Sequence, residues 1–173
     1  VYCLRRGPFE IGGVICTINW DDEDLGQIVR PPRPGDGSGL EAGWVWPVGI
    51  VCDPEERLIV SDESDHSITV LTREGEEIAR WGEYGSQAGQ LDRPAHMAID
   101  GEGHVLIVDT MNHRVQRFTV EGRYIDGFGH QGSSSGELNM PWGIALDAEG
   151  CIYVGDWRND RVQKFSPSYE PLL

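Results

Sequence analysis

The sequence has few basic residues and no long apolar run. Lysine and arginine total 14 against 29 aspartates and glutamates, which gives a net charge of -15. An acidic excess of this size repels phosphate groups, so neither nucleic acid nor an anionic membrane is expected as a general partner. No apolar stretch approaches the ~20 residues that a membrane-spanning helix needs. We therefore expect a soluble protein without a membrane span.

Cysteine motifs and helical periodicity are also scarce. None of the four cysteines forms a CxxC pair, the spacing typical of many zinc and redox sites. A bridge between Cys3 and Cys16 and a set of free thiols both fit the sequence, and free thiols are favoured. No segment keeps a helical period. No signal peptide is visible, and the first residues read as if they lay within a domain, so the localisation is left open.

What the sequence does contain is a repeat of 47 residues. Prolines open the three copies at positions 47, 94 and 141, and two aspartates recur at fixed distances behind each proline. The recurring aspartates are Asp53, Asp100 and Asp147, and then Asp62, Asp109 and Asp156. A fixed period of this size indicates a solenoid or a propeller.

Each copy holds four short apolar runs separated by turn residues. In the second copy the runs cover residues 96–100, 105–109, 115–120 and 124–128, and they are rich in β-branched and aromatic residues. Glycine-containing breaks separate them, which is typical of strands joined by turns. Four strands (a to d) in a repeat of this length predict one blade of a β-propeller.

The strand count predicts an all-β chain with about three and a half blades. Residues 1–43 are expected to form a degenerate partial blade and a Pro/Gly-rich loop. Complete blades are expected over 44–85 and 86–132, and a blade without its outer strand over 133–173. A closed propeller needs at least about four blades. Either the chain is a fragment of a longer protein, or a homo-oligomer completes the propeller. The missing last strand favours a natural C-terminus and a truncated N-terminus, because in a propeller a strand from the N-terminus can complete the last blade.

The repeats resemble a known family. The segment Asn112-His113-Arg114-Val115, together with the Pro-x-Gly-Ile-Ala run that opens the third copy, closely resembles the NHL repeat. The resemblance covers about residues 44–173. It implies a β-propeller that is usually six-bladed, in which strand a lines the central channel. It also implies that the d–a and b–c loops form the usual ligand face.

The resemblance leaves the function open, because fold does not decide it. It implies protein-binding modules, RNA-binding modules and a distant zinc enzyme, peptidyl-hydroxyglycine amidating lyase; lactone hydrolases on related propellers bind calcium. The zinc histidines of that lyase follow the strand-a proline. The matching residues here are Val48, Ala95 and Trp142, so this zinc chemistry is not expected in these blades.

The candidate ligand-binding residues lie on the expected ligand face. His96 breaks its own repeat, because Gly49 and Gly143 hold the equivalent positions, and a residue that departs from its repeat is a functional candidate. Tryptophan, methionine and arginine, which are enriched at protein interfaces, gather in the neighbouring loops. The predicted site consists of His96, Met111, Arg114, Trp142, Trp157 and Arg158.

Two repeated sets are expected to be structural. The aspartates that end strand b can fix the following turn by accepting backbone N–H groups. His66 and His113 occupy equivalent loop positions, with Asp160 at the third, and equivalent loops that radiate from an axis do not converge on one metal ion.

These observations favour a non-enzymatic binding or scaffold module. It would recognise a protein, a peptide or a small ligand through the b–c and d–a loop face, without a cofactor. The alternative is a metal-assisted lyase or hydrolase with its site in the channel and zinc or calcium as cofactor. No Ser-His-Asp set, phosphate loop or nucleophile elbow is apparent.

Overall fold

The computed structural model describes residues 2–6, 13–18, 24–28 and 45–172. Its strands form four antiparallel sheets, and each sheet runs through neighbouring strands in chain order. Two one-turn 3₁₀ helices, η1 (Thr110–Asn112) and η2 (Trp157–Asn159), are the helices of this part of the chain. None of the described helices has the length and apolarity to cross a membrane.

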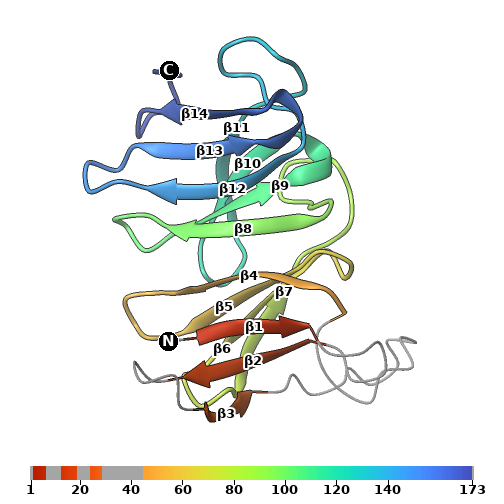
Figure 1. The fold of residues 1–173 in the computed structure, drawn as a ribbon, viewed down its shortest axis with the longest axis vertical. Coiled ribbons are helices and arrows are strands. Elements are labelled where there is room, and N and C mark those ends of the chain that lie inside the picture. Colours follow the sequence, from red (N-terminus) through yellow and green to blue (C-terminus); the bar gives the residue numbers. More distant parts are fainter. Residues whose placement is uncertain (1, 7–12, 19–23, 29–44, 173) are drawn as a thin grey trace.

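Three of the sheets follow the 47-residue repeat and are named blades I to III. Blade I contains β4 (Pro47–Cys52), β5 (Leu58–Asp62), β6 (Ser67–Leu71) and β7 (Glu77–Trp81). Blade II contains β8 (Pro94–Ile99), β9 (Val105–Asp109), β10 (Arg114–Phe118) and β11 (Tyr124–Phe128). Blade III contains β12 (Pro141–Leu146), β13 (Ile152–Asp156) and β14 (Arg161–Phe165). The first strands β4, β8 and β12 lie side by side (Figure 1), so the sheets are successive blades of a β-propeller.

The blades are held together by the apolar strands between them. All five residues of β5 and of β9 are buried, because each strand b lies in a sheet that has a neighbour on its face. One core cluster includes Ile59, Ile107 and Phe118, so it joins blades I and II. A second includes Val108, Val154 and Phe165 and joins blades II and III. Burying such side chains is worth roughly 1.5–3 kcal/mol each.

The sheet at the N-terminal end contains β1 (Tyr2–Arg6), β2 (Gly13–Ile18) and β3 (Asp24–Ile28). Its strand β1 contacts β4 of blade I. The β2–β3 pair has a register shift between Thr17 and Ile18, and the third and fourth strands of blades I and II have the same shift near their ends. The backbone of this sheet therefore follows the pattern of strands c and d in a blade.

The chain makes one more turn after β14, the last strand of blade III. Ser166 and Glu170 close a turn that matches the turns at 72–76 and 119–123, and Phe165 then pairs with Pro171. The chain therefore turns back and starts along the path of a fourth strand, instead of leaving the sheet after β14. The sheet of blade III itself contains the three strands β12, β13 and β14.

A buried aspartate at the end of each strand b organises the loops. The Asp109 carboxylate accepts bonds from the backbone N–H of Asp92, the Asn112 amide, the Arg114 guanidinium and the Gln116 amide at 2.7–3.0 Å. Asp156 has the equivalent four partners in blade III. In blade I, Asp62 accepts four backbone N–H groups. The structural role expected for these aspartates is confirmed.

We predict that Asp109→Ala destabilises the fold by about 3 kcal/mol. The substitution leaves the Arg114 guanidinium and several buried donors without their shared acceptor. Urea unfolding of the purified protein measures the loss. The control is Glu149→Ala, which removes an exposed carboxylate and should change the free energy of unfolding by less than about 0.5 kcal/mol. Equal effects of the two substitutions would contradict the role assigned to Asp109.

Candidate functional site

A cleft of about 540 Å³ opens on the face that carries the b–c loops and the d–a loops. In Figure 1 this face lies on the right, where η1 follows β9. Three blades contribute to the walls of the cleft. The lining residues are Trp46, Glu63, Ser64, Arg93, Thr110, Met111, Met140, Trp142 and Trp157. A cleft with apolar and aromatic walls and a few polar groups is the usual form of a binding site.

The cleft residues occupy equivalent places in successive blades. Trp46, Arg93 and Met140 each precede the proline of a strand a, and each is 47 residues from the next. Glu63, Thr110 and Trp157 each follow the aspartate that ends strand b. Ser64 and Met111 come one residue later. The repeat thus brings the same loop positions of three blades around one opening.

The residues at equivalent cleft positions differ in chemical character from blade to blade. At the position before the proline, an aromatic residue, a cation and a thioether replace one another, whereas the supporting positions keep aspartate, asparagine, arginine and glutamine in blades II and III. A residue that only stabilises the blade has the same role in each copy, so the same residue type can occur in every copy. Side chains that change from copy to copy around a shared cleft point to contact with one asymmetric ligand.

Hydrogen bonds hold the cleft loops in place before any ligand binds. The backbone N–H of Met111 bonds to the carbonyl of Asp92, and that of Arg158 bonds to the carbonyl of Asn139. The Thr110 hydroxyl donates to the carbonyl of Pro141 at 2.9 Å. Each bond joins one b–c loop to the lead-in or the first residue of a strand a. Little order therefore has to be gained on binding.

The repeated histidines support the same loops. The Nδ1 of His66 accepts the backbone N–H of Arg93 at 3.1 Å, and the Nδ1 of His113 accepts that of Met140 at 3.0 Å. Both histidines have a left-handed backbone, with φ of 51° and 56°. They therefore set the residue that precedes each proline at the cleft, and their expected structural role is confirmed.

The cleft exposes large apolar side chains beside one ion pair. Trp157 is 53% exposed, and Met111 and Trp46 are also exposed. The guanidinium of Arg158 lies 4.7 Å from the centre of the Trp157 ring. Arg93 and Glu63 pair at 3.4 Å. The site can accommodate an apolar or aromatic group, with a carboxylate and two guanidinium groups available for polar contacts.

His96 contacts Trp142 but does not line the cleft. Its Nδ1 lies 3.1 Å from the carbonyl oxygen of Trp142, and the two rings meet edge to face at 6.3 Å. Because a carbonyl oxygen only accepts, Nδ1 donates and Nε2 keeps its lone pair in the neutral ring. His96 is half-buried and positions the backbone of the strand that presents Trp142.

Of the six residues predicted from the sequence, the structure places Met111, Trp142 and Trp157 in the cleft wall. Arg158 stacks on Trp157, and His96 contacts Trp142. Arg114 lies elsewhere: besides Asp109 it bonds the carbonyls of Ser86, Gln87 and Gln90 in the lead-in loop. We therefore assign Arg114 to the scaffold and leave it out of the proposed site.

The sequence analysis does not predict six of the lining residues, namely Trp46, Glu63, Ser64, Arg93, Thr110 and Met140. Three of them precede the prolines that open the strands a, and the other three lie in the b–c loops. The sequence signal that could have identified the residues before the prolines is that this position carries a different residue type in each copy of the repeat. Comparing the copies position by position would have shown it.

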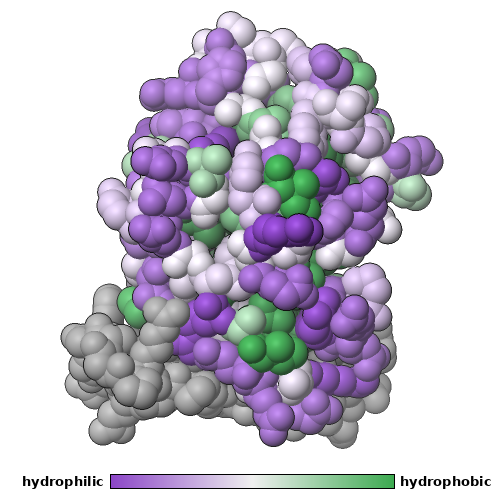
Figure 2. Space-filling view, turned by 180° about the vertical axis from the view of Figure 1, so that it is seen from behind, coloured by the Kyte–Doolittle hydropathy of each residue, from purple (hydrophilic) through white to green (hydrophobic). Residues whose placement is uncertain are grey.

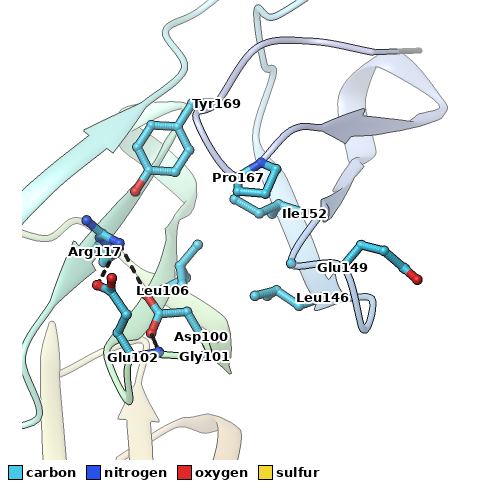
Figure 3. Close-up of a pocket in the computed structure, with 11 residues that line it drawn as sticks. Asp100, Gly101, Glu102, Leu106, Arg117, Leu146, Glu149, Ile152, Pro167 and Tyr169 are labelled. Carbon is cyan, nitrogen blue, oxygen red and sulfur yellow. Dashed lines mark hydrogen bonds and ion pairs between the residues drawn. The ribbon is translucent and has the colours of Figure 1, made fainter.

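A smaller cavity of about 250 Å³ lies between blades II and III, toward the a–b and c–d turns (Figure 3). Its apolar part includes Leu106, Leu146 and Ile152, and Arg117 and Tyr169 form part of its rim. Burial, together with the hydrogen bond that its hydroxyl donates to Asp126 at 2.6 Å, raises the pKa of Tyr169 well above its usual range. The phenol therefore stays neutral and acts as a fixed donor.

Comparison with known proteins identifies the repeats. The model of the NHL repeat matches residues 91–118 and 138–165. These two segments are NHL repeats. They correspond to β8–β10 and β12–β14 with the lead-ins before them. No match was found among curated proteins.

Solved structures share the propeller fold of these NHL repeats. A streptogramin B lyase superposes with a TM-score of 0.64 at 13% identity, over 92% of this chain and 46% of its own. An inactive variant of virginiamycin B lyase from Staphylococcus aureus, solved with quinupristin, gives 0.64 at 14% identity, with 92% and 47% covered. A gluconolactonase from Xanthomonas campestris gives 0.55 at 15% identity, with 74% and 46% covered. The chain thus spans about half the length of these proteins, and the likeness concerns the fold.

The exposure of the cleft tryptophan has a direct spectroscopic consequence. We predict that Trp157→Phe lowers the acrylamide quenching of the protein's fluorescence, because it removes a solvent-exposed indole. Trp81→Phe should not lower it, because the Trp81 indole is partly buried and donates to the carbonyl of Val120 at 2.9 Å. Stern–Volmer slopes of the two variants and the parent protein decide the matter. A larger loss of quenching in the Trp81 variant would contradict the cleft geometry.

Proposed function

We propose that the chain is the ligand-recognition part of an NHL propeller that binds a peptide segment of a partner protein through the b–c and d–a loop face. The observation that supports this most is the asymmetry of the cleft. Three blades bring Trp46, Trp142 and Trp157 together with Met111 and Met140 at one opening. Tryptophan and methionine are among the residues that contribute most to protein interfaces.

The net charge of the molecule indicates which kind of peptide it would bind. With a net charge of -15, the protein attracts basic segments and repels acidic ones. Figure 2 shows a mainly hydrophilic surface with small separate hydrophobic patches on the side opposite the view of Figure 1. The partner peptide would insert an aromatic or long aliphatic side chain among the tryptophans, with a basic residue near Glu63.

The alternative, a metal-assisted lyase or hydrolase in the channel, draws on the fold alone. The similar structures include lyases and a gluconolactonase. Among the described residues, one group of side chains could ligate a metal ion, and it lies at an a–b turn. His96 does not belong to this group. We therefore favour binding, and we treat the activities of those proteins as their own.

The experiment is selection from a random peptide library displayed on phage, against the parent protein and against Trp157→Ala. We expect enriched peptides to carry an aromatic or long aliphatic residue next to a basic one, and to bind Trp157→Ala at least about 10-fold more weakly, as for a central interface tryptophan. The matched control is Ile78→Ala, which removes an equally exposed apolar side chain from β7. It should leave the affinity unchanged.

Two outcomes would contradict the proposal. Peptides that bind the Trp157 variant as tightly as the parent would move the site away from the cleft. Failure to enrich any peptide, together with a lactone-hydrolysing or lyase activity that His96→Ala removes, would support the channel enzyme instead.

A further inference from the structure

A mixed cluster of possible metal ligands lies on the opposite side of the molecule from the cleft, in the a–b turn of blade II. It consists of Asp100, Glu102 and His104. The Nδ1 of His104 lies 3.5 Å from a carboxylate oxygen of Asp100 and 3.3 Å from one of Glu102. All three ligand atoms lie within 4.8 Å of one another. Figure 3 shows Asp100 and Glu102 on one side of the cavity, next to Arg117.

The other blades show what this turn ordinarily contains. Blade I has Asp53 and Glu55 at the matching positions, and Arg57 stands where blade II has His104. The Arg57 guanidinium lies 2.6 Å from Asp53 and 3.4 Å from Glu55. In blade III, Lys164 lies 3.4 Å from Asp147. In blade II the position of Arg57 is held by His104, whose imidazole can serve as a metal ligand, which a guanidinium cannot.

The His104 ring nitrogen is an unsatisfied group in an acidic setting. Its Nδ1 is buried and has no hydrogen-bond partner among the described residues. The atoms in front of it are carboxylate oxygens, which can accept from an Nδ1–H but offer nothing to an Nδ1 lone pair. Buried polar atoms in folded proteins almost always have a partner. A cation between the imidazole and the two carboxylates would be a partner for all three groups.

The distances suit a zinc ion better than a larger one. Zinc binds nitrogen and oxygen ligands at ~2.0–2.2 Å in a tetrahedron, which places neighbouring ligand atoms about 3.3–3.5 Å apart. The two distances from His104 Nδ1 fall in this range. The second oxygen of Asp100 accepts the backbone N–H groups of Glu102 at 2.8 Å and His104 at 2.9 Å. These bonds orient the carboxylate in the way that supporting groups orient metal ligands.

Among the described residues, Arg117 is the cation that pairs with the cluster. One of its terminal nitrogens lies 3.3 Å from Asp100 and 3.7 Å from Glu102. Its other two nitrogens bond Asp126 at 3.2 and 2.9 Å, so the guanidinium has an anchor of its own. Three carboxylates share this single guanidinium, and the excess negative charge favours a further cation.

We propose that Asp100, Glu102 and His104 bind one zinc ion, which clamps the a–b turn of blade II where blade I uses Arg57. The site lies at the other end of the blades from the cleft, so it does not depend on the proposed peptide binding.

The experiment is titration of the chelator-treated protein with Zn²⁺ by calorimetry, and with Co²⁺ by absorption spectroscopy. We expect one ion per chain, and a tetrahedral cobalt spectrum without the thiolate charge-transfer band that cysteine ligands produce. His104→Gln should weaken zinc binding at least about 10-fold. The matched control is His130→Gln, which removes an exposed histidine on the lead-in loop that faces a single carboxylate and should leave the affinity unchanged.

A second variant keeps the test decisive if His104→Gln folds poorly. His104→Arg reproduces the arrangement of blade I and should lose the response to zinc while remaining folded. The parent should gain about 5–10 °C in melting temperature at a 100-fold excess of zinc over its Kd. Unchanged zinc affinity in both His104 variants, or a thiolate band in the cobalt spectrum, would overturn the proposal.

Discussion

The buried carboxylate that ends strand b is the interaction on which the rest of the molecule depends. In blades II and III one aspartate accepts bonds from an asparagine, an arginine, a glutamine and the backbone of the lead-in loop, and its side chain is fully buried. A buried charge is tolerated only when it is paired and fully hydrogen-bonded. Meeting this requirement fixes the b–c loop and the following d–a loop together, and these two loops form the walls of the cleft.

In this arrangement, the residues that stabilise the loops are different from those that would contact a ligand. The aspartate network and the loop histidines set the backbone at the residue before each proline and at the residue after each strand b. At those places Trp46 and Trp157 are exposed and contribute little to the core, whereas the buried Thr110 also holds its loop through the Pro141 carbonyl. The frame therefore tolerates different side chains in different copies. In this chain they differ widely, from Glu63 to Thr110 to Trp157 at one position alone. A rigid repeated frame with variable residues at its mouth suits recognition of a ligand that has no repeat of its own.

The second site would use the same frame differently. At the a–b turns the two carboxylates recur, and what varies is the cation that serves them. Blades I and III satisfy such a turn with an arginine and a lysine, and in blade II the proposed zinc ion would act beside Arg117. The choice affects the stability of one blade and leaves the cleft at the opposite end untouched.

The sequence predicts most of the frame because a fixed period leaves little freedom. The strands of blade II begin and end within two residues of the runs at 96–100, 105–109, 115–120 and 124–128. Trp142, Trp157 and Met111 were also predicted on the correct face, because loop positions in a propeller follow from strand order.

The sequence could not show that Arg114 is used up by carbonyl groups of the lead-in loop, since those partners lie 24 to 28 residues away. Nor did it show that Tyr169 closes a turn in place of the glycines at 75 and 122. The Arg114 contacts join segments distant in the chain, and they recur one period later at Arg161. The Tyr169 turn is local, and its left-handed backbone is seen only in the structure.

The most direct test of the central claim is hydrogen–deuterium exchange with and without a selected peptide. Protection on binding is predicted in the segments that carry the cleft, at residues 63–64, 110–111, 140–142 and 157–158, with the a–b turns at 53–57 and 100–104 unchanged. Protection confined to the a–b turns or to the outer strands β7 and β11 would contradict the account.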